Sequence, residues 1–208
     1  MSRKQLVGIV GKKGSGKNAL ASALGKLLEG EFLEVAFAGA LKWAVQDIFR
    51  LSDEQVHGDL KEELDLRWGK TPRELMQLFG TEVGRQIDKE VWVKSVWAQA
   101  VQAWEAEADM VVVVTDVRFL NEAEFILKHG GLLVRVERPD PQVRMFGAHS
   151  SEMEMEKIVP HLTVVNDGPL KSLDYAAEWV EEGLSRPLSE KNEESTFVCS
   201  AAESWGED

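Results

Sequence analysis

A glycine-rich loop near the start of the chain has the residue types and the spacing of a phosphate-binding loop. It runs from Gly11 to Lys17, reads GKKGSGK, and follows the apolar run from Leu6 to Val10. Glycines let the backbone curl so that successive N–H groups point at one anion, and the start of the next helix adds partial positive charge. Lys17 is then expected to reach the β- and γ-phosphates of a nucleotide. The residues expected to contact that nucleotide are Gly11, Lys12, Lys13, Gly14, Ser15, Gly16, Lys17 and Asn18.

The residue after Lys17 is a candidate ligand for a metal ion. Loops of this type usually carry Ser or Thr there, whose hydroxyl binds Mg²⁺, whereas this chain has Asn18. An amide oxygen is a weaker ligand or binds through water. We predict that Asn18 and Asp116 hold Mg²⁺. The competing interpretation of the loop, an ordinary glycine-rich turn between a strand and a helix, is disfavoured because the spacing and both flanking elements match.

Two charged residues follow an apolar run with the character of a buried central strand. The run from Val111 to Thr115 is β-branched throughout, and Asp116 and Arg118 come directly after it. Ligands of open α/β sheets bind at the carboxyl ends of the strands. Asp116 is therefore placed to hold Mg²⁺, its water or an acceptor hydroxyl, and Arg118 to bind a phosphate. The alternative for Asp116 is capping of the helix after Phe119, and both roles can hold.

A long irregular segment separates the expected strands at 132–137 and 162–165. Long connections inside compact domains are usually lids or disordered segments, so we predict a lid over residues 138–160. It carries Arg138 and Arg144, which on a closing lid would neutralise charge on a transferring phosphoryl group.

The helix expected over residues 71–86 has two different sides. Thr71 and Pro72 form a helix start, and Trp92 near the start of the next helix is a candidate for ring stacking. A stripe of polar and small residues follows one side: Arg73, Gln77, Gly80, Thr81 and Gly84. Glycines cost helix stability, so this stripe predicts a surface that a ligand approaches closely. The alternative is contact of the glycines with a neighbouring helix.

Apolar runs alternate with helix-like segments along most of the chain. Strands are expected at 6–10, 32–37, 110–115, 132–137 and 162–165. This alternation predicts an α/β fold, a P-loop three-layer α/β/α arrangement with a parallel central sheet and helical or lid insertions. Ala38, Gly39 and Ala40 follow the second strand, where they could admit a ligand or form a tight turn.

Length and charge limit the classes of function. The chain has 208 residues, of which 44% are hydrophobic, and a formal net charge of −12. We expect one P-loop domain over 1–185 and an acidic, disordered tail over 186–208. Because nucleic-acid polymers demand a basic surface, such a partner is disfavoured, and so is a nucleic-acid-driven ATPase.

The number of cysteines and the first residues of the chain indicate the cellular compartment of the protein. Cys199 is the only cysteine, which excludes an intramolecular disulfide and a multi-cysteine zinc site. The start of the chain shows no signal-peptide pattern, and no apolar run is long enough to span a membrane. We expect a soluble cytoplasmic protein with no membrane partner.

Several separated stretches together resemble one family, the bacteriophage deoxynucleoside monophosphate kinases. The matching stretches are Ser15-Gly16-Lys17, Ala38-Gly39-Ala40-Leu41-Lys42, Arg73 to Thr81, Trp92-Val93-Lys94, Asp116-Val117-Arg118 with Asn121-Glu122, Arg138-Pro139, His149 to Glu152 and Asn166-Asp167-Gly168. They cover about residues 5–180 in order, and their joint order is more specific than any one of them. The family usually has Asp-Thr after the loop lysine, where this chain has Asn18-Ala19.

The resemblance implies a nucleoside-monophosphate-kinase fold, ATP as phosphoryl donor with Mg²⁺, and a deoxynucleoside monophosphate as acceptor. It also implies a homodimer, and the host cytoplasm if the gene is phage-borne. The residues expected to bind the acceptor are Lys13, Ala38, Gly39, Lys42, Arg73, Gln77, Gly80, Thr81, Trp92, Asp116, Arg118, Asn121 and Glu122. Expected catalytic residues are Lys17, Asp116, Arg118, Arg138 and Arg144. Two alternatives stay open: a P-loop kinase of another small acceptor, and a nucleotide-binding module with impaired catalysis.

Overall fold

The computed structural model describes residues 5–139, 154–169, 171–185 and 195–199. Contacts divide the chain into two compact units, where the sequence predicted one domain over 1–185. One unit comprises Ala36–Gln99 and is here called the helical unit. The other comprises Met1–Val35 with Ala100–Asp208 and is called the sheet unit. The helical unit is thus an insertion in the sequence of the sheet unit.

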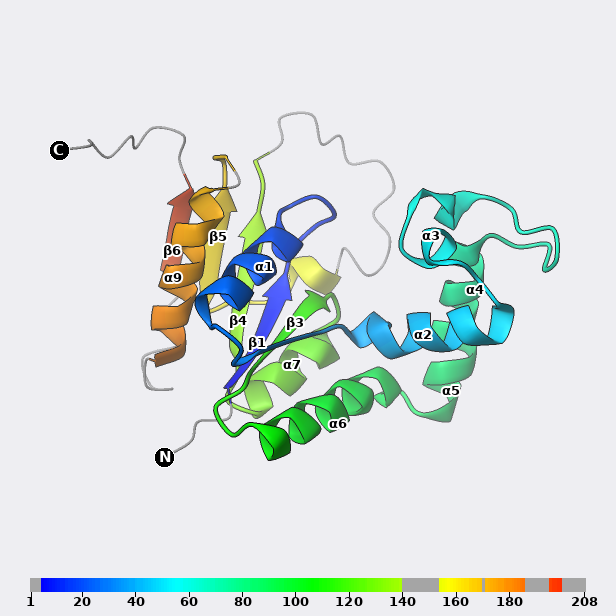
Figure 1. Ribbon diagram of the computed structural model, residues 1–208, viewed down its shortest axis with the longest axis horizontal. Helices are drawn as coiled ribbons and strands as arrows, with labels where there is room; N and C mark the ends of the chain where they lie inside the picture. The colour runs from blue at the N-terminus through cyan, green and yellow to red at the C-terminus, as the bar shows by residue number, and fades with distance from the viewer. Residues whose placement is uncertain (1–4, 140–153, 170, 186–194, 200–208) are drawn as a thin grey trace. The chain divides into compact units, whose positions relative to one another are not determined.

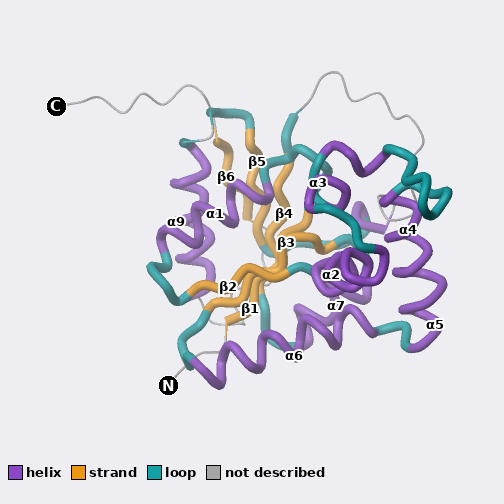
Figure 2. The backbone as a smooth tube through the Cα atoms, turned by 45° about the vertical axis from the view of Figure 1, so that its right-hand side comes forward, coloured by secondary structure: helices purple, strands orange, loops and turns teal. Residues whose placement is uncertain are grey.

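The sheet unit is built on six parallel strands in the order β2-β3-β1-β4-β5-β6, which lie side by side in Figure 2. The strands are β1 (Gln5–Val10), β2 (Phe32–Val35), β3 (Val111–Val117), β4 (Leu132–Glu137), β5 (Leu162–Asn166) and β6 (Ser195–Cys199). Five of them match predicted strands, although β2 ends two residues earlier than expected. Parallel strands need crossover connections, and helices supply them here.

Helices cover both faces of this sheet (Figure 1). The helices α1 (Lys17–Leu27) and α9 (Ser172–Ser185) pack on one face, where Leu24 and Val180 join strand residues in the core. On the other face lies α7 (Leu120–Lys128), and a Cβ at Gly8 would come within 3.1 Å of Ile126. Three layers, helix, sheet and helix, therefore confirm the predicted α/β/α class.

The edge strand β6 corrects the expectation that residues 186–208 form a disordered tail. Residues 195–199 pair with β5 along its whole length, and the Phe197 ring lies 5.5 Å from that of Trp179 on α9. Cys199 is 2% exposed, and burial raises the pKa of its thiol. The alternating pattern Ser-Thr-Phe-Val-Cys is typical of an edge strand. It was not predicted because the surrounding residues are rich in Ser and Glu, a composition typical of disorder. The rest of the predicted tail lies outside the described residues.

The helical unit contains short helices around its own small core. Its elements are α2 (Phe37–Phe49), α3 (Asp53–Val56), the 3₁₀ turn η1 (Asp59–Glu62), α4 (Pro72–Leu78), the π-helix η2 (Phe79–Gly84), α5 (Arg85–Ile87) and the first part of α6 (Val91–Ala106). Val45, Leu51, Val56 and Leu75 form the core. Among the described residues of either unit, no helix has the length and apolarity needed to cross a bilayer.

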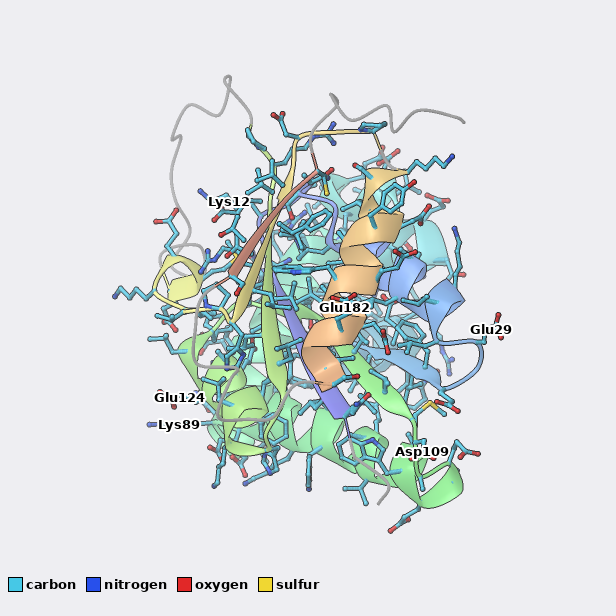
Figure 3. All side chains as sticks on the ribbon, turned by 90° about the vertical axis from the view of Figure 1, so that its left-hand side faces the viewer. Lys12, Glu29, Lys89, Asp109, Glu124 and Glu182 are labelled. Carbon is cyan, nitrogen blue, oxygen red and sulfur yellow. The ribbon has the colours of Figure 1, made fainter. Side chains whose placement is uncertain are left out.

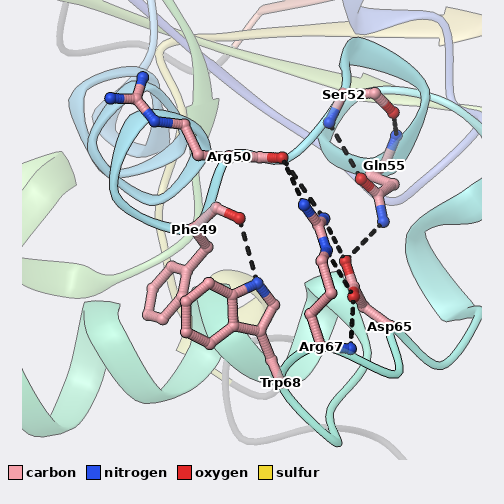
Figure 4. Close-up of polar contacts among 7 residues, drawn as sticks. All are labelled: Phe49, Arg50, Ser52, Gln55, Asp65, Arg67 and Trp68. Atoms are coloured by element: carbon pink, nitrogen blue, oxygen red, sulfur yellow. Dashed lines mark hydrogen bonds and ion pairs between the residues drawn. The ribbon is translucent and has the colours of Figure 1, made fainter.

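The stretch 52–67 is rich in charged residues, yet one of its carboxylates is buried. Asp65 is only 8% exposed, and its carboxylate accepts hydrogen bonds from the Arg67 guanidinium at 2.5 Å and from Gln55 at 3.0 Å. The Arg67 side chain holds the pKa of Asp65 well below its usual range. Trp68 donates from Nε1 to the Phe49 carbonyl, and Arg67 to the Arg50 carbonyl (Figure 4). This network fixes the loop before α4 to the end of α2.

The predicted helix at 71–86 is interrupted by the π-helix η2. A π-helix has wider turns than an α-helix, so side chains after Leu78 leave the faces that a 3.6-residue period assigns. Leu78 is 43% exposed, whereas Gly80 and Gly84 are buried. The polar stripe therefore does not hold: its glycines face inward, away from its exposed polar members.

The buried glycines lie against side chains of neighbouring helices. Contact with a neighbouring helix was the alternative to ligand binding for these glycines. A Cβ at Gly80 would lie 2.9 Å from Leu41, and one at Gly84 would lie 2.4 Å from the Trp92 ring. The Trp92 indole also donates to the Gly80 carbonyl at 3.2 Å. Gly80 and Trp92, both expected to bind the acceptor, thus contact each other inside the helical unit.

Replacing Gly84 with Ala is expected to lower the free energy of unfolding by about 1–3 kcal/mol, because the added methyl overlaps the Trp92 ring. Urea denaturation of the full chain measures the change. Gly39→Ala is the matched control, since the nearest atom to its Cβ position is 3.9 Å away, and it should be neutral or stabilising. Equal effects of the two substitutions would contradict the packing assigned to Trp92.

Candidate active site

The glycine-rich loop leaves β1 in the conformation that a phosphate cradle requires. The β1–β3 register shifts between Gly8 and Val10, directly before the loop. Gly14 and Gly16 have φ angles of 80° and 108°, which side chains rarely adopt. A Cβ at Gly11 would lie 2.5 Å from the Val136 carbonyl oxygen. Each of these glycines is therefore required, as the sequence predicted.

The interior of the loop holds a lysine and an unpaired hydroxyl. Lys17 Nζ donates to the carbonyls of Gly11 at 2.6 Å and Lys12 at 2.7 Å. Ser15 is 4% exposed, and within the described residues its Oγ is buried without a hydrogen-bond partner. A buried hydroxyl without a partner is costly, and a bound phosphate oxygen would satisfy it. The loop thus fits the triphosphate of a nucleotide.

Lys17 lies within electrostatic reach of the two charged residues at the end of β3. Burial, and next the charge of Arg118, lower the pKa of Lys17 to about 8, while the charge of Asp116 raises it. Asp116 is half-buried within β3, and Arg118 is exposed in the turn that follows. The adjacent strands β1 and β3 therefore bring together the lysine, the carboxylate and the guanidinium that the sequence predicted to act jointly.

Glu122 has a structural role that the resemblance did not indicate. It is 4% exposed, and its Oε2 accepts the backbone N–H groups of Arg118 at 2.9 Å and Phe119 at 3.1 Å. This carboxylate therefore fixes the turn that carries Arg118, and the acceptor contact expected for it stays a prediction. Asn121, in the first turn of α7, is half-buried.

Part of the predicted lid is attached to the sheet by an arginine of β4. The Arg135 guanidinium donates to the carbonyls of Met155 at 3.1 Å and of Ile158. Glu156, in the same stretch, forms an ion pair with Lys12 of the loop at 3.0 Å. Figure 3 shows Lys12 near one end of the sheet and Asp109 near the other. Residues 154–158 are thus held next to the phosphate-binding loop.

The remaining predicted residues of the sheet unit are exposed or undescribed. Lys13, Asn18 and Arg138 are exposed. Arg144 lies outside the described residues, as does most of the predicted lid. Over the described ranges, no cluster of three or more His, Cys, Asp or Glu side chains could hold a metal ion. Mg²⁺ in kinases usually keeps substrate phosphates and waters as most of its ligands, so one carboxylate such as Asp116 is compatible with it.

The predicted acceptor residues of the helical unit lie on α2, α4, η2 and the start of α6. Ala38, Gly39 and Lys42 are half-buried near the start of α2. Arg73 forms an ion pair with Glu62, and the Thr81 hydroxyl donates to the Gln77 carbonyl at 2.7 Å. Their contacts to a nucleotide stay predictions.

Sequence reasoning missed two residues that support the loop. Arg135 is a lone cation in an apolar strand, and that exception to the pattern was its only signal. Asn166, named only among the stretches that carry the family resemblance, is 3% exposed and donates from Nδ2 to the Ser15 carbonyl at 2.9 Å. Both act on residues far away in the sequence, which local patterns do not reveal.

The parallel sheet and the loop after β1 define a P-loop protein of the three-layer α/β/α class. The family model described as deoxynucleotide monophosphate kinase matches residues 59–176. A protein of Acanthamoeba polyphaga mimivirus with the provisional name deoxynucleotide monophosphate kinase is 37% identical over 174 residues, 78% of this chain and 88% of the viral protein. The chain belongs to the deoxynucleotide monophosphate kinase family, which confirms the resemblance in its motifs.

Two further comparisons show a weaker likeness. The deoxynucleoside-5'-monophosphate kinase of Escherichia phage T5 is 32% identical over 116 residues, 53% of this chain and 45% of the phage protein. Dephospho-CoA kinase from Campylobacter jejuni, a solved structure, is 12% identical with a TM-score of 0.46, covering 88% of this chain and 98% of that one.

Proposed function

We propose that the protein transfers the γ-phosphoryl group of ATP to a deoxynucleoside monophosphate. An oxygen of the acceptor phosphate forms the new bond to the γ-phosphorus as the bond to the β-phosphate oxygen breaks, giving ADP and a deoxynucleoside diphosphate. The observation that carries the proposal is the grouping of Lys17, Asp116 and Arg118 beside the cradle in a chain of this family.

The acceptor oxygen is already anionic, so the reaction needs no strong general base. Catalysis then comes from positioning and from neutralising charge in the transition state. Lys17 would bind the β- and γ-phosphates, and Arg118 would bind the transferring or accepting phosphate. Mg²⁺ on the phosphates would supply further positive charge, with Asp116 and Asn18 as its protein ligands. Arg138 and Arg144 are proposed to add positive charge from the lid.

The residues that the family resemblance assigns to the acceptor site remain part of this proposal. Most are proposed to contact the acceptor, whereas one supports a turn. Lys13, Asn121 and the predicted residues of α2, α4, η2 and α6 are proposed to contact the acceptor directly. Glu122 is proposed to act through the turn that holds Arg118, since its Oε2 accepts two backbone N–H groups there. A homodimer and the host cytoplasm are likewise proposals from the family, and analytical ultracentrifugation tests the dimer.

A panel of acceptors tests the proposed substrate class. ADP release is followed in a coupled assay with ATP, Mg²⁺ and, one at a time, the deoxynucleoside monophosphates, the ribonucleoside monophosphates, a sugar acid and a dephosphorylated coenzyme precursor. ADP release that depends on at least one deoxynucleoside monophosphate supports the proposal. Release with only a non-nucleotide acceptor, or tight ATP binding with no release, would overturn it in favour of another kinase or of an impaired binding module.

ATP binding is expected to take up a proton at mildly alkaline pH. The pKa of Lys17 in the free protein is lowered to about 8, so about half of the molecules carry a neutral Lys17 at pH 8. Phosphate charge favours the ammonium and raises this pKa again, so affinity falls as the pH rises above 8.

Titration calorimetry in buffers of different ionisation enthalpy measures this uptake. We expect about half a proton per ATP at pH 8 and nearly none at pH 6.5. The Lys17→Met variant should lose the uptake at pH 8. An uptake that persists in this variant would assign the proton to another group.

A further inference from the structure

Asn166 joins the last residue of β5 to the phosphate-binding loop. Its side chain is buried, and Nδ2 donates to the Ser15 carbonyl at 2.9 Å. The two residues are 151 positions apart in the sequence. Loss of a buried hydrogen bond costs more free energy than loss of an exposed one, because the remaining buried group is left unpaired. This contact therefore constrains the loop from outside the loop itself.

The loop lies directly on Asn166, with no room for a side chain between them. A Cβ at Gly16 would lie 2.5 Å from Asn166 Nδ2 and 3.5 Å from Leu173 of α9. On the side of β4, a Cβ at Gly11 would lie 2.5 Å from the Val136 carbonyl oxygen. The backbone of the loop is thus packed against the ends of β4 and β5.

The bond to Asn166 fixes the direction of one peptide group. In a trans peptide the C=O and the following N–H point in opposite directions. Because Asn166 holds the Ser15 carbonyl, the Gly16 N–H must face away from Asn166. Gly16 is the residue before α1 and its carbonyl accepts the first helical bond, from Leu20 at 2.9 Å. The N–H groups at this helix start are those that a phosphate would use.

We propose that Asn166 is a positioning residue for the nucleotide triphosphate: by holding the Ser15 carbonyl, it keeps the Ser15–Gly16 peptide turned so that its N–H, and not its carbonyl oxygen, faces the bound phosphates. Without this donor the peptide can rotate and present a partial negative charge to the anion. The inference rests on the proposed function only for the identity of the anion as ATP.

The test compares full-length Asn166→Leu with the wild-type protein. Leucine keeps the branched shape of asparagine, with two methyl groups in place of the amide oxygen and nitrogen, and removes the donor. We expect the Kd for ATP, measured by titration calorimetry, to rise about tenfold, as for loss of one hydrogen bond to a buried group. The KM for ATP should rise in parallel, while the KM for the acceptor stays within about twofold. An unchanged Kd for ATP in folded protein would overturn the inference.

Two additions keep the test decisive. Asn166→Asp preserves shape and polarity if the leucine variant does not fold, and the same loss of ATP affinity is expected. The matched control is Asp167→Asn, an exposed neighbour that should bind ATP like the wild type. A purely structural role of Asn166 would lower the amount of folded protein and leave the affinity of the folded fraction unchanged.

A ligand-free measurement separates this inference from the proposed function. The amide resonance of Gly16 in a proton–nitrogen correlation spectrum should shift in the Asn166 variants and stay in place in Asp167→Asn. Failure of the wild-type protein to phosphorylate any nucleotide would refute the function and leave this comparison valid. An unshifted Gly16 resonance would refute the inference even if phosphorylation is observed.

Discussion

Replacement of Lys17 by Ala is expected to lower kcat for phosphoryl transfer by about a thousandfold, because the transition state loses its nearest positive charge. The side chain bonds two carbonyls of its own loop and is within the field of Asp116 and Arg118. Its removal leaves those carbonyls accessible to water, so the fold should persist. Steady-state kinetics with ATP and the best deoxynucleoside monophosphate measure the loss, and circular dichroism checks the fold.

The matched control for Lys17 is Lys26→Ala, which removes an exposed lysine from the last turn of the same helix. It should leave kcat unchanged. If Lys17→Ala retains more than about a tenth of the wild-type kcat while Lys26→Ala behaves as expected, Lys17 cannot be the main phosphate ligand of the transition state.

Replacement of Arg118 by Ala is expected to lower kcat about a hundredfold, with a smaller effect on the KM for ATP. Arg118 follows β3, its charge acts on Lys17, and Glu122 holds its backbone N–H at 2.9 Å. The guanidinium carried by this anchored turn can bind a phosphate through two parallel hydrogen bonds. Arg118→Lys should recover only part of the rate, since an ammonium cannot reproduce that geometry.

Lys128→Ala serves as the charge control for Arg118, because it removes an exposed cation from the last turn of α7 in the same unit. No change in kcat is expected for it. A rate in Arg118→Ala equal to that of this control would show that Arg118 takes no part in the transfer step.

The phosphate-binding loop and the end of β3 were predictable because their signals are local. Glycine spacing between an apolar strand and a helix start identifies the loop, and φ values of 80° and 108° at Gly14 and Gly16 confirm why glycine is needed. A continuous β-branched run identifies β3 as central. Because β1 and β3 are adjacent parallel strands, Lys17 after β1 lies near Asp116 of β3. Strand order and the two local signals are enough to predict this.

Contacts between distant segments were not predictable in the same way. Ser15 lies in the loop after β1 and Asn166 at the end of β5, and only the strand order places them together. Arg135 reaches carbonyls of the stretch before β5, a contact that no spacing rule reports. Asp65 is likewise buried in a charged stretch because Arg67 and Gln55 bind its carboxylate, and composition does not reveal those contacts.

The helix at 71–86 shows how a local irregularity defeats a periodic argument. The predicted stripe assumed 3.6 residues per turn from Arg73 to Gly84, but η2 changes the phase after Leu78. Gly80 and Gly84 therefore contact Leu41 and Trp92. The glycines of this helix correctly predicted a close contact. The group in contact with them is a side chain of the same unit and not a ligand.

The most direct test of the proposed reaction is phosphorus NMR of a mixture of the protein, ATP, Mg²⁺ and one deoxynucleoside monophosphate at a time. The proposal predicts that, for at least one base, the monophosphate signal is replaced by the paired signals of a deoxynucleoside diphosphate while ATP becomes ADP in equal amount. Conversion of ATP to ADP and inorganic phosphate with every monophosphate signal intact would contradict it.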